Sequence, residues 1–474
     1  MWYDDKLKEF WQTSPAGRSC RGKGGGGVGK WMLSCLILLA AMVVLSGCEF
    51  GSVEELYALP KSSEAYVNLQ AKINQEKGNA EYIAPLNGEN RQTIQLVDVD
   101  GDGTQEAVTF FRDTTAEAPL TIVIFKQDDR EEYQVYTRIE GVGSEIESIE
   151  YLQLGGSGGI DILVSWQVSA SVHSLVGYTI SGGQPVEIMR SGYSRYLTTD
   201  QDGDGLEEVI LAQSGTNSSP SLRIEYYDGR DGIMELMSTA PLSEGATDIS
   251  SWQAGQLEGG EPALFVTSFF GKDVLITDVF CLREDQGLRN IAMDPATRRS
   301  ASTFHYYAGV QPEDINGDGL IDVPVAVAVE SYGESSVERF WWLKWMDYQQ
   351  SGERKQVMTT YHSGDGWYLE IPETWSGDFS MRRQESSTIG VRTVTFARGV
   401  EGEESQVTPF LEISCLVGSD RTRQAEEGDR FILYSDATTI YTAQFLDSDW
   451  DCGLDQEGLK ARFHASLDGW DTSQ

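Results

Sequence analysis

The chain has 474 residues, of which 74 are Asp or Glu and 36 are Lys or Arg, so its formal net charge at pH 7 is −38. A surface this acidic repels nucleic acid and anionic lipid headgroups, which excludes nucleic-acid binding as a function. Apolar residues make up 40% of the chain, enough for a folded core, and six cysteines in this length exclude a disulfide scaffold.

An apolar run near the amino terminus ends in the sequence LSGC at Cys48. The run covers residues 31–44, which is shorter than the roughly 20 residues that a membrane-spanning helix needs. The stretch resembles the bacterial lipobox, in which cleavage of the signal leaves the cysteine as a lipid-bearing first residue. The resemblance implies a lipoprotein signal peptide over residues 1–47, a lipid on Cys48 that holds the protein to the membrane, and a position on the extracellular face of the bacterial cell membrane.

Residues 48–84 are predicted to form a linker with one short helix. Tyr66, Leu69 and Ile73 lie at helical spacing, and their apolar side chains form one stripe. Gly78 ends the run. We expect this stripe to pack on the domain that follows.

An acidic loop occurs three times along the chain. In the first copy, QLVDVDGDGTQEAVTFF, every second residue from the first aspartate offers an oxygen, and glycines lie between the acids. Oxygen ligands at this spacing suit a hard divalent cation such as calcium. The predicted metal-binding positions are Asp98, Asp100, Asp102, Thr104 and Glu106 in the first loop, Asp200, Asp202, Asp204, Leu206 and Glu208 in the second, and Asp314, Asn316, Asp318, Leu320 and Asp322 in the third.

These loops do not match the EF-hand. An EF-hand needs a bidentate glutamate at position 12 and a helix on each side. Position 12 is Thr109, Leu211 and Val325 in the three copies, and the residues that follow each loop are rich in Val and Ile, as strands are. Each loop is therefore predicted to join two strands.

Two eroded copies lie between the intact loops. QLGGSGGIDILVSW keeps the glycines and Asp161 but has Gln153 and Ser157 in place of acids, and a shorter copy near Gln256 keeps only the outline. The five copies recur every 47 to 58 residues, a period that suggests a solenoid or a propeller. Each period contains four short predicted strands. We therefore expect a mainly β fold, with a β-propeller of about five four-stranded blades over residues 85–349.

The intact loop followed by an apolar strand resembles the FG-GAP/VCBS-type repeat, which integrin α-subunit propellers and many bacterial surface proteins carry. The resemblance implies that each loop joins the first two strands of a blade and binds calcium, with up to three sites here and none in the second and fourth blades. Closing a turn of three or four carboxylates without a cation would force like charges together, so the calcium is expected to be structural.

Residues 350–474 lack the repeat and are predicted to form a smaller α+β domain, separated from the propeller by the polar stretch QQSGERKQ. Its opening, WYLEIPETW, and its strand order resemble PsbP-like α+β modules. A closing helix is predicted from the spacing of Leu459, Phe463 and Leu467. Cys415 and Cys452 in this domain either pair or remain as two buried thiols.

The sequence does not point to a catalytic centre. Ser157 satisfies the pattern G-x-S-x-G, but it leads into a strand rather than into the helix that a nucleophile elbow requires. No histidine has a paired metal-ligand spacing such as H-E-x-x-H, and the four are His173, His305, His362 and His464.

One aromatic cluster is a candidate for sugar binding. Trp341, Trp342 and Trp345 in FWWLKWMDY offer ring faces that can stack on pyranose sugars. Neighbours along a strand point to opposite faces, so at least one of Trp341 and Trp342 is expected in the core.

The function expected from these features is a lipid-anchored, calcium-stabilised cell-surface protein of binding or adhesion type, without catalytic activity, whose ligand is a glycan or a protein. The alternative is an extracellular polysaccharide hydrolase or lyase that uses acidic residues at the propeller channel.

Overall fold

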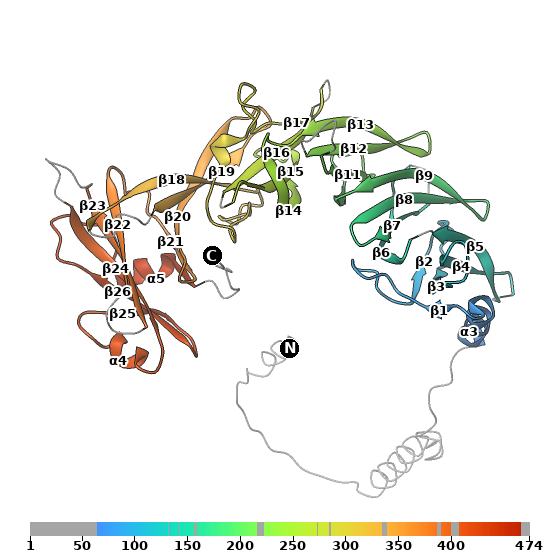
Figure 1. The fold of residues 1–474 in the computed structure, drawn as a ribbon, viewed down its shortest axis with the longest axis horizontal. Coiled ribbons are helices and arrows are strands. Elements are labelled where there is room, and N and C mark those ends of the chain that lie inside the picture. Colours follow the sequence, from blue (N-terminus) through green and yellow to red (C-terminus); the bar gives the residue numbers. More distant parts are fainter. Residues whose placement is uncertain are drawn as a thin grey trace, which may run out of the picture. The chain divides into compact units, whose positions relative to one another are not determined.

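The computed structural model describes residues 64–465 apart from residues 131, 142, 156–158, 216–221, 273, 284–285, 334–338, 386–389 and 400–406. The described chain is mainly β, as predicted, and its strands form several four-stranded antiparallel sheets and two larger ones (Figure 1). No helix in this part of the chain is long and apolar enough to cross a membrane. The predicted signal peptide, Cys48 and Ser157 lie outside the described residues.

The predicted amino-terminal helix is α3 (Glu64–Lys77). Leu69 and Ile73 are buried in a cluster with side chains of the first sheet. Gly78 follows the helix with φ +51°, a left-handed conformation that glycine adopts without strain. Leu69 and Ile73 therefore pack on the sheet as predicted, whereas Tyr66, the third residue of the predicted stripe, is 53% exposed. The short strand β1 (Glu81–Tyr82) comes next and pairs with the end of the third strand of the chain.

Four sheets have four consecutive strands that pair antiparallel in chain order, and we call them the first to fourth units. Their strands are β2 (Ile94–Val97), β3 (Glu106–Arg112), β4 (Leu120–Gln127) and β5 (Tyr133–Gly141); β6 (Glu145–Leu152), β7 (Asp161–Ser169), β8 (Val172–Ser181) and β9 (Gln184–Tyr193); β10 (Arg195–Thr199), β11 (Glu208–Gln213), β12 (Arg223–Arg230) and β13 (Ile233–Pro241); and β14 (Ala246–Gln256), β15 (Pro262–Phe270), β16 (Leu275–Arg283) and β17 (Gly287–Asn290).

Neighbouring units pack face to face. The second strand of each unit is almost fully buried because apolar side chains occupy both of its faces. Val108 and Phe110 of β3, for example, share one cluster with Ile162 and Val164 of β7. Similar clusters join the second unit to the third, the third to the fourth and the fourth to the strands that follow. Each sheet thus covers the apolar face of the next.

The last sheet has ten strands in the order β25-β26-β24-β23-β22-β18-β19-β20-β21-β27. We call β18 to β21 the fifth unit, and β18 joins it to the remaining strands through a short parallel pairing with β22. The elements are the 3-10 helix η1 (Ala301–Thr303), β18 (Val323–Ser331), β19 (Phe340–Tyr348), β20 (Arg354–Ser363), β21 (Trp367–Glu370), β22 (Phe379–Glu385), β23 (Val391–Arg398), β24 (Thr408–Val417), α4 (Arg421–Ala425), β25 (Phe431–Ser435), β26 (Thr439–Phe445), α5 (Gln456–Arg462) and β27 (Phe463–Ala465).

The structure differs from the predicted domain boundary at residues 349/350. The stretch QQSGERKQ forms the hairpin turn between β19 and β20, where the amide of Gly352 donates to the carbonyl oxygen of Gln349. Gly352 has φ +89°, which suits a tight turn. The four strands of the fifth unit therefore end at Glu370, and the boundary drawn from composition divides one sheet.

The carboxy-terminal cysteines remain unpaired. Cys415 and Cys452 are both buried in the same large apolar cluster, and both are free thiols, as is Cys281 in β16. The sequence left open a pair or two buried thiols, and the structure shows two buried thiols.

Candidate metal centres

The three acidic loops share one backbone shape. The first aspartate of each loop accepts a hydrogen bond from a glycine amide at each of its oxygens, and for Asp98 the donors are Gly101 and Gly103 at 2.9 Å. Asp200 and Asp314 repeat these bonds at 2.7 to 3.1 Å. All six glycines have φ between +74° and +90°, which explains the glycine at both positions.

The acid that ends each loop is fully buried. One oxygen of Glu106, Glu208 and Asp322 accepts the backbone amide that follows the first aspartate, at 2.9, 2.6 and 3.1 Å. The other oxygen of each carboxylate has no hydrogen-bond partner. A buried carboxylate oxygen without a donor is unfavourable, so each of these atoms points to a nearby positive group or a bound proton.

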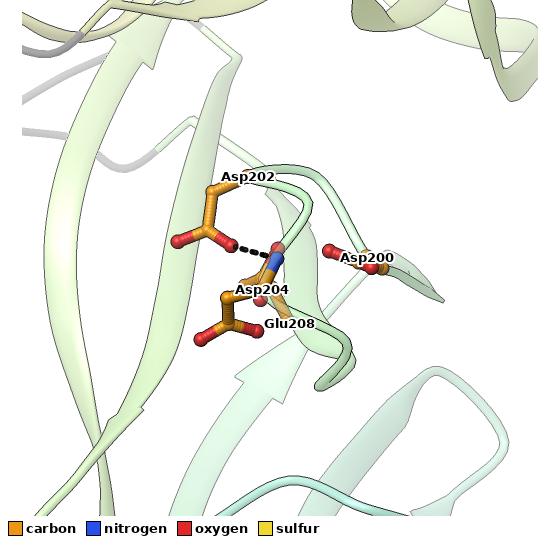
Figure 2. Close-up of side chains that lie close together, drawn as sticks. All are labelled: Asp200, Asp202, Asp204 and Glu208. Carbon is orange, nitrogen blue, oxygen red and sulfur yellow. Dashed lines mark hydrogen bonds between the residues drawn. The ribbon is translucent and has the colours of Figure 1, made fainter.

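The second loop gathers a complete acidic cluster. Asp200, Asp202, Asp204 and Glu208 each place one oxygen within 4.8 Å of the others (Figure 2). The amide of Asp204 donates to Asp202 Oδ1 at 3.1 Å, which holds the two aspartates on the same turn. Burial raises the pKa of Glu208 to about 8, and the charges of Asp202 and Asp200 contribute to the rise. This cluster can bind a metal ion.

The first loop holds a lysine among its acids. Asp98, Asp100 and Glu106 each place one oxygen within 4.8 Å of the others. Lys126 Nζ, from β4, forms an ion pair with Asp100 and lies 2.6 Å from Asp102 Oδ2 and 3.8 Å from Glu106 Oε1. Burial opposes the charge on Lys126, yet its hydrogen bonds with Asp100 and Asp102 raise its pKa. The loop thus contains its own positive group, which the loop sequence alone did not reveal.

The third loop is arranged differently. Among the described residues it brings no three acids within 4.8 Å of one another. The Asn316 amide donates to Asp318 Oδ2 at 2.9 Å, so these predicted ligands bond to each other. The segment before the loop contributes a single bridge, Glu313 to Asp322, rather than the strand that the repeat pattern predicts.

The seventh loop positions hold the turn through their backbone. Thr104, Leu206 and Leu320 donate their amides to the aspartate two residues earlier, at 2.8, 2.8 and 3.0 Å. Leu206 and Leu320 have no side-chain oxygen, so a metal ion could take only their carbonyl oxygens.

The described part of the eroded loop in the second unit keeps the terminal acid, Asp161, which is buried and has one oxygen without a hydrogen-bond partner. Asp161 Oδ2 accepts the amides of Leu154 and Gly155, at 3.0 and 2.9 Å, which is the role of the terminal acid in the intact loops. Near Gln256 a short turn closes through the amide of Leu257 and the carbonyl oxygen of Glu261, at 2.9 Å.

The tryptophan cluster separates into three environments. Trp345 is fully buried, and Trp341 stacks on Tyr306 with ring centroids 4.1 Å apart. Trp342 lines a cleft of about 1130 Å³ against β18, β19 and β20, together with Trp375. One of the three predicted sugar-stacking residues therefore lies at a concave surface.

The histidines do not join the acidic loops. His305 and His362 are buried, and burial lowers their pKa values to about 4 and about 3, which keeps both rings neutral at pH 7. His464 Nε2 lies 2.7 Å from Glu370 Oε1. Within the described part of the chain, no histidine belongs to a group of metal-ligating side chains.

No protein-family model matches the chain, and no curated protein matches it. Among solved structures, the chain is similar to a rhamnogalacturonan lyase from Bacillus licheniformis at 11% identity and a TM-score of 0.27, over 77% of this chain and 72% of that one. It is also similar to a protein from Lactobacillus plantarum at 11% identity and a TM-score of 0.22, over 67% and 88% of the two chains. A hypothetical protein from Leishmania major matches at 12% identity and a TM-score of 0.21, over 61% and 92%.

Proposed function

We propose that this chain is a lipid-anchored, calcium-stabilised protein of the bacterial cell surface that binds a ligand without changing it chemically. The second acidic loop carries the proposal. Its cluster combines three exposed aspartates with Glu208, which is buried and keeps one oxygen without a hydrogen bond. The Tyr226 hydroxyl lies beside Glu208, and a cation held among the four carboxylates would supply the positive charge that this oxygen lacks.

Calcium is the ion that suits this cluster best. All side-chain ligands are carboxylate oxygens, which hard cations prefer, and a glycine-rich turn allows the irregular geometry that calcium tolerates better than magnesium does. The ion would join strands β10 and β11 by closing the turn between them. The loop supplies ligands and glycines only, so the role of the ion is structural.

The recurring loop and the face-to-face packing of the units support a β-propeller of the FG-GAP/VCBS type. In the first and third units an intact loop joins the first strand to a buried second strand, which is the place that this resemblance implies. We propose five blades, the last of which begins with β18.

The cleft beside β19 is the proposed ligand-binding surface. Trp342 lines the cleft beside the largely buried Trp375, and Glu330, Lys344 and Asp378 add polar groups to the lining. Aromatic faces with neighbouring charges suit a glycan. The same carboxylates favour the alternative, a polysaccharide hydrolase or lyase, if they act on the bound chain.

Glycan binding without turnover is the expected result for the mature chain carrying Cys48→Ser. A glycan array identifies a bound sugar, and chromatography of the same mixture after long incubation shows no shorter product. Trp342→Ala should weaken binding at least tenfold, because stacking area is lost from the cleft wall. Trp341→Ala, on the opposite face of β19, is the matched control and should bind as the parent chain does. Product formation would establish the enzymatic alternative instead.

Lipidation at Cys48 makes a second prediction. Changing Cys48→Ala should release the protein from the membrane fraction, because the acidic surface itself is repelled by anionic headgroups. Mass spectrometry of the parent chain should show the added lipid. Retention of the variant in the membrane fraction, together with an unmodified parent mass, would exclude the anchor.

A further inference from the structure

One position on a neighbouring strand faces the terminal acid of every loop. In the first, third and fifth units, the strand after the loop pairs with the next strand through Ala107–Phe125, Val209–Tyr227 and Val323–Met346. One register step beyond each pair, the terminal acid lies opposite a charged residue on the same face of the sheet. These facing pairs are Glu106 with Lys126, Glu208 with Asp228, and Asp322 with Asp347.

Lys126 brings positive charge into the first loop. Its ammonium group has three N–H donors, and it contacts Asp100, Asp102 and Glu106. The Lys126 side chain is only 25% exposed, so it is enclosed by the loop rather than extended into solvent. The hydrogen bond with Lys126 lowers the pKa of Asp102, which keeps that aspartate ionised and paired.

Asp228 and Asp347 bring negative charge to the same place in the other two loops. The Asp228 side chain is 15% exposed and its Oδ2 lies 3.8 Å from Arg230 Nε, yet burial and then the charge of Asp202 raise its pKa. Asp347 is 4% exposed and has an oxygen without a hydrogen-bond partner. Burial and then the neighbouring Asp347 raise the pKa of Asp322, so two buried carboxylates lie side by side. Such a pair either shares a proton or holds a cation between its members, and calcium would take the place of the shared proton.

The two units with eroded loops have no charge at this position. The register step beyond Ile162–Tyr178 places Thr179 opposite Asp161, and the step beyond Ala263–Cys281 places Leu282 opposite Pro262. A charged residue therefore faces the loop only where the loop is acidic.

We propose that this facing position decides how each acidic loop is neutralised. Lys126 closes the first loop as an internal cation, whereas Asp228 and Asp347 each add a carboxylate to the second and third loops, which bind one calcium ion apiece. The inference rests on the proposed calcium binding and reduces the expected number of ions from three to two.

The chemistry of the two groups explains this division. An ammonium group and a divalent cation compete for the same oxygens and repel each other, so a loop that encloses Lys126 has low affinity for calcium. An added carboxylate has the opposite effect, because calcium affinity rises with the number of charged ligands.

Native mass spectrometry of the mature Cys48→Ser chain, titrated with calcium chloride, tests the proposal by counting ions. The parent chain should take up two ions. Lys126→Ala should take up three, because the first loop loses its internal cation. Asp228→Lys should take up one, because an ammonium group then enters the second loop. Gln127→Ala, one residue along β4 and on its other face, is the control and should keep the parent count.

Asp347 is tested by a milder change because it is buried. Asp347→Asn should weaken calcium binding at one site about tenfold or more while circular dichroism shows an unchanged fold. Three ions on the parent chain, or two on Lys126→Ala, would overturn the role of Lys126. If Asp228→Lys still takes up two ions and Asp347→Asn binds calcium as tightly as the parent chain does, the role of the aspartates is overturned. A count of zero on the parent would remove the proposed calcium function itself, which is a separate outcome.

Discussion

Removing calcium from the mature chain is expected to lower its unfolding temperature by about 3 to 6 °C. A ligand that binds only the folded state stabilises it by RT ln(1 + [L]/Kd). Extracellular modules often bind calcium with Kd of roughly 10⁻⁴ to 10⁻³ M, so about 10 mM calcium contributes roughly 1.4 to 2.7 kcal/mol per site. Two sites together give a shift of this size in a chain of several hundred residues.

Single substitutions should divide this effect among the loops. Asp204→Asn and Asp318→Asn each occupy the fifth position of a calcium-binding loop, so each should remove about half of the calcium-dependent shift. Asp102→Asn changes the same position of the first loop, where Lys126 supplies the positive charge, and should leave the shift close to that of the parent. Differential scanning calorimetry with calcium and with a chelator measures all four chains. If the parent chain unfolds at the same temperature with calcium and with chelator, the metal proposal is ruled out.

Local patterns predicted the loops and the helix because each depends on residues close together in the chain. The glycines at 101 and 103 are needed for left-handed backbone within one turn, and the aspartate that binds their amides lies a few residues away. The helical spacing of Leu69 and Ile73 likewise produced one buried face. The strands after the loops were predictable because apolar residues on both faces indicate burial on both sides.

Contacts between distant residues were not predictable from the same patterns. Lys126 reaches Asp100 only because β3 and β4 pair in one register, and a shift by one residue would turn Lys126 to the other face. The sequence signal that could have found it is a charged residue near the end of the second strand after each loop. When the pairing register of the two strands is unknown, nothing distinguishes that residue from any other charged residue at the end of a strand.

Two segments were misread because one pattern fits two structures. A polar stretch with glycine is typical of a domain linker and also of a hairpin turn, and around Gly352 it is a turn. Leu459 and Phe463 lie at helical spacing, yet α5 ends at Arg462 and Phe463 begins β27. Pairing of β27 with β21, far earlier in the chain, outweighs the local helical preference.

The fourth unit raises the question of what replaces the acidic loop that it lacks. Asp278 of β16 is fully buried and accepts four hydrogen bonds: from the amide and hydroxyl of Ser243 at 2.8 and 2.6 Å, from Asn290 at 2.7 Å, and from the hydroxyl of Ser300 at 2.6 Å. Burial raises the pKa of Asp278, and these hydrogen bonds oppose the rise. The carboxylate thus joins the segment before β14, the end of β17 and the segment that leads to β18.

Asp278→Ala is therefore expected to destabilise the chain by about 3 to 5 kcal/mol, at the upper end for single substitutions, because four buried donors lose their acceptor together. The midpoint of urea unfolding measures this effect. Ser300→Ala removes one donor and leaves the others paired, so it should be milder, at about 1 kcal/mol. Asp294→Ala, on the exposed part of the same segment, removes the same charge and should change the midpoint little. Because the network contains no loop acid, the loss at Asp278 should be equal with calcium and with chelator. A loss that disappears in chelator would mean that this network and the calcium loops stabilise the units as one system.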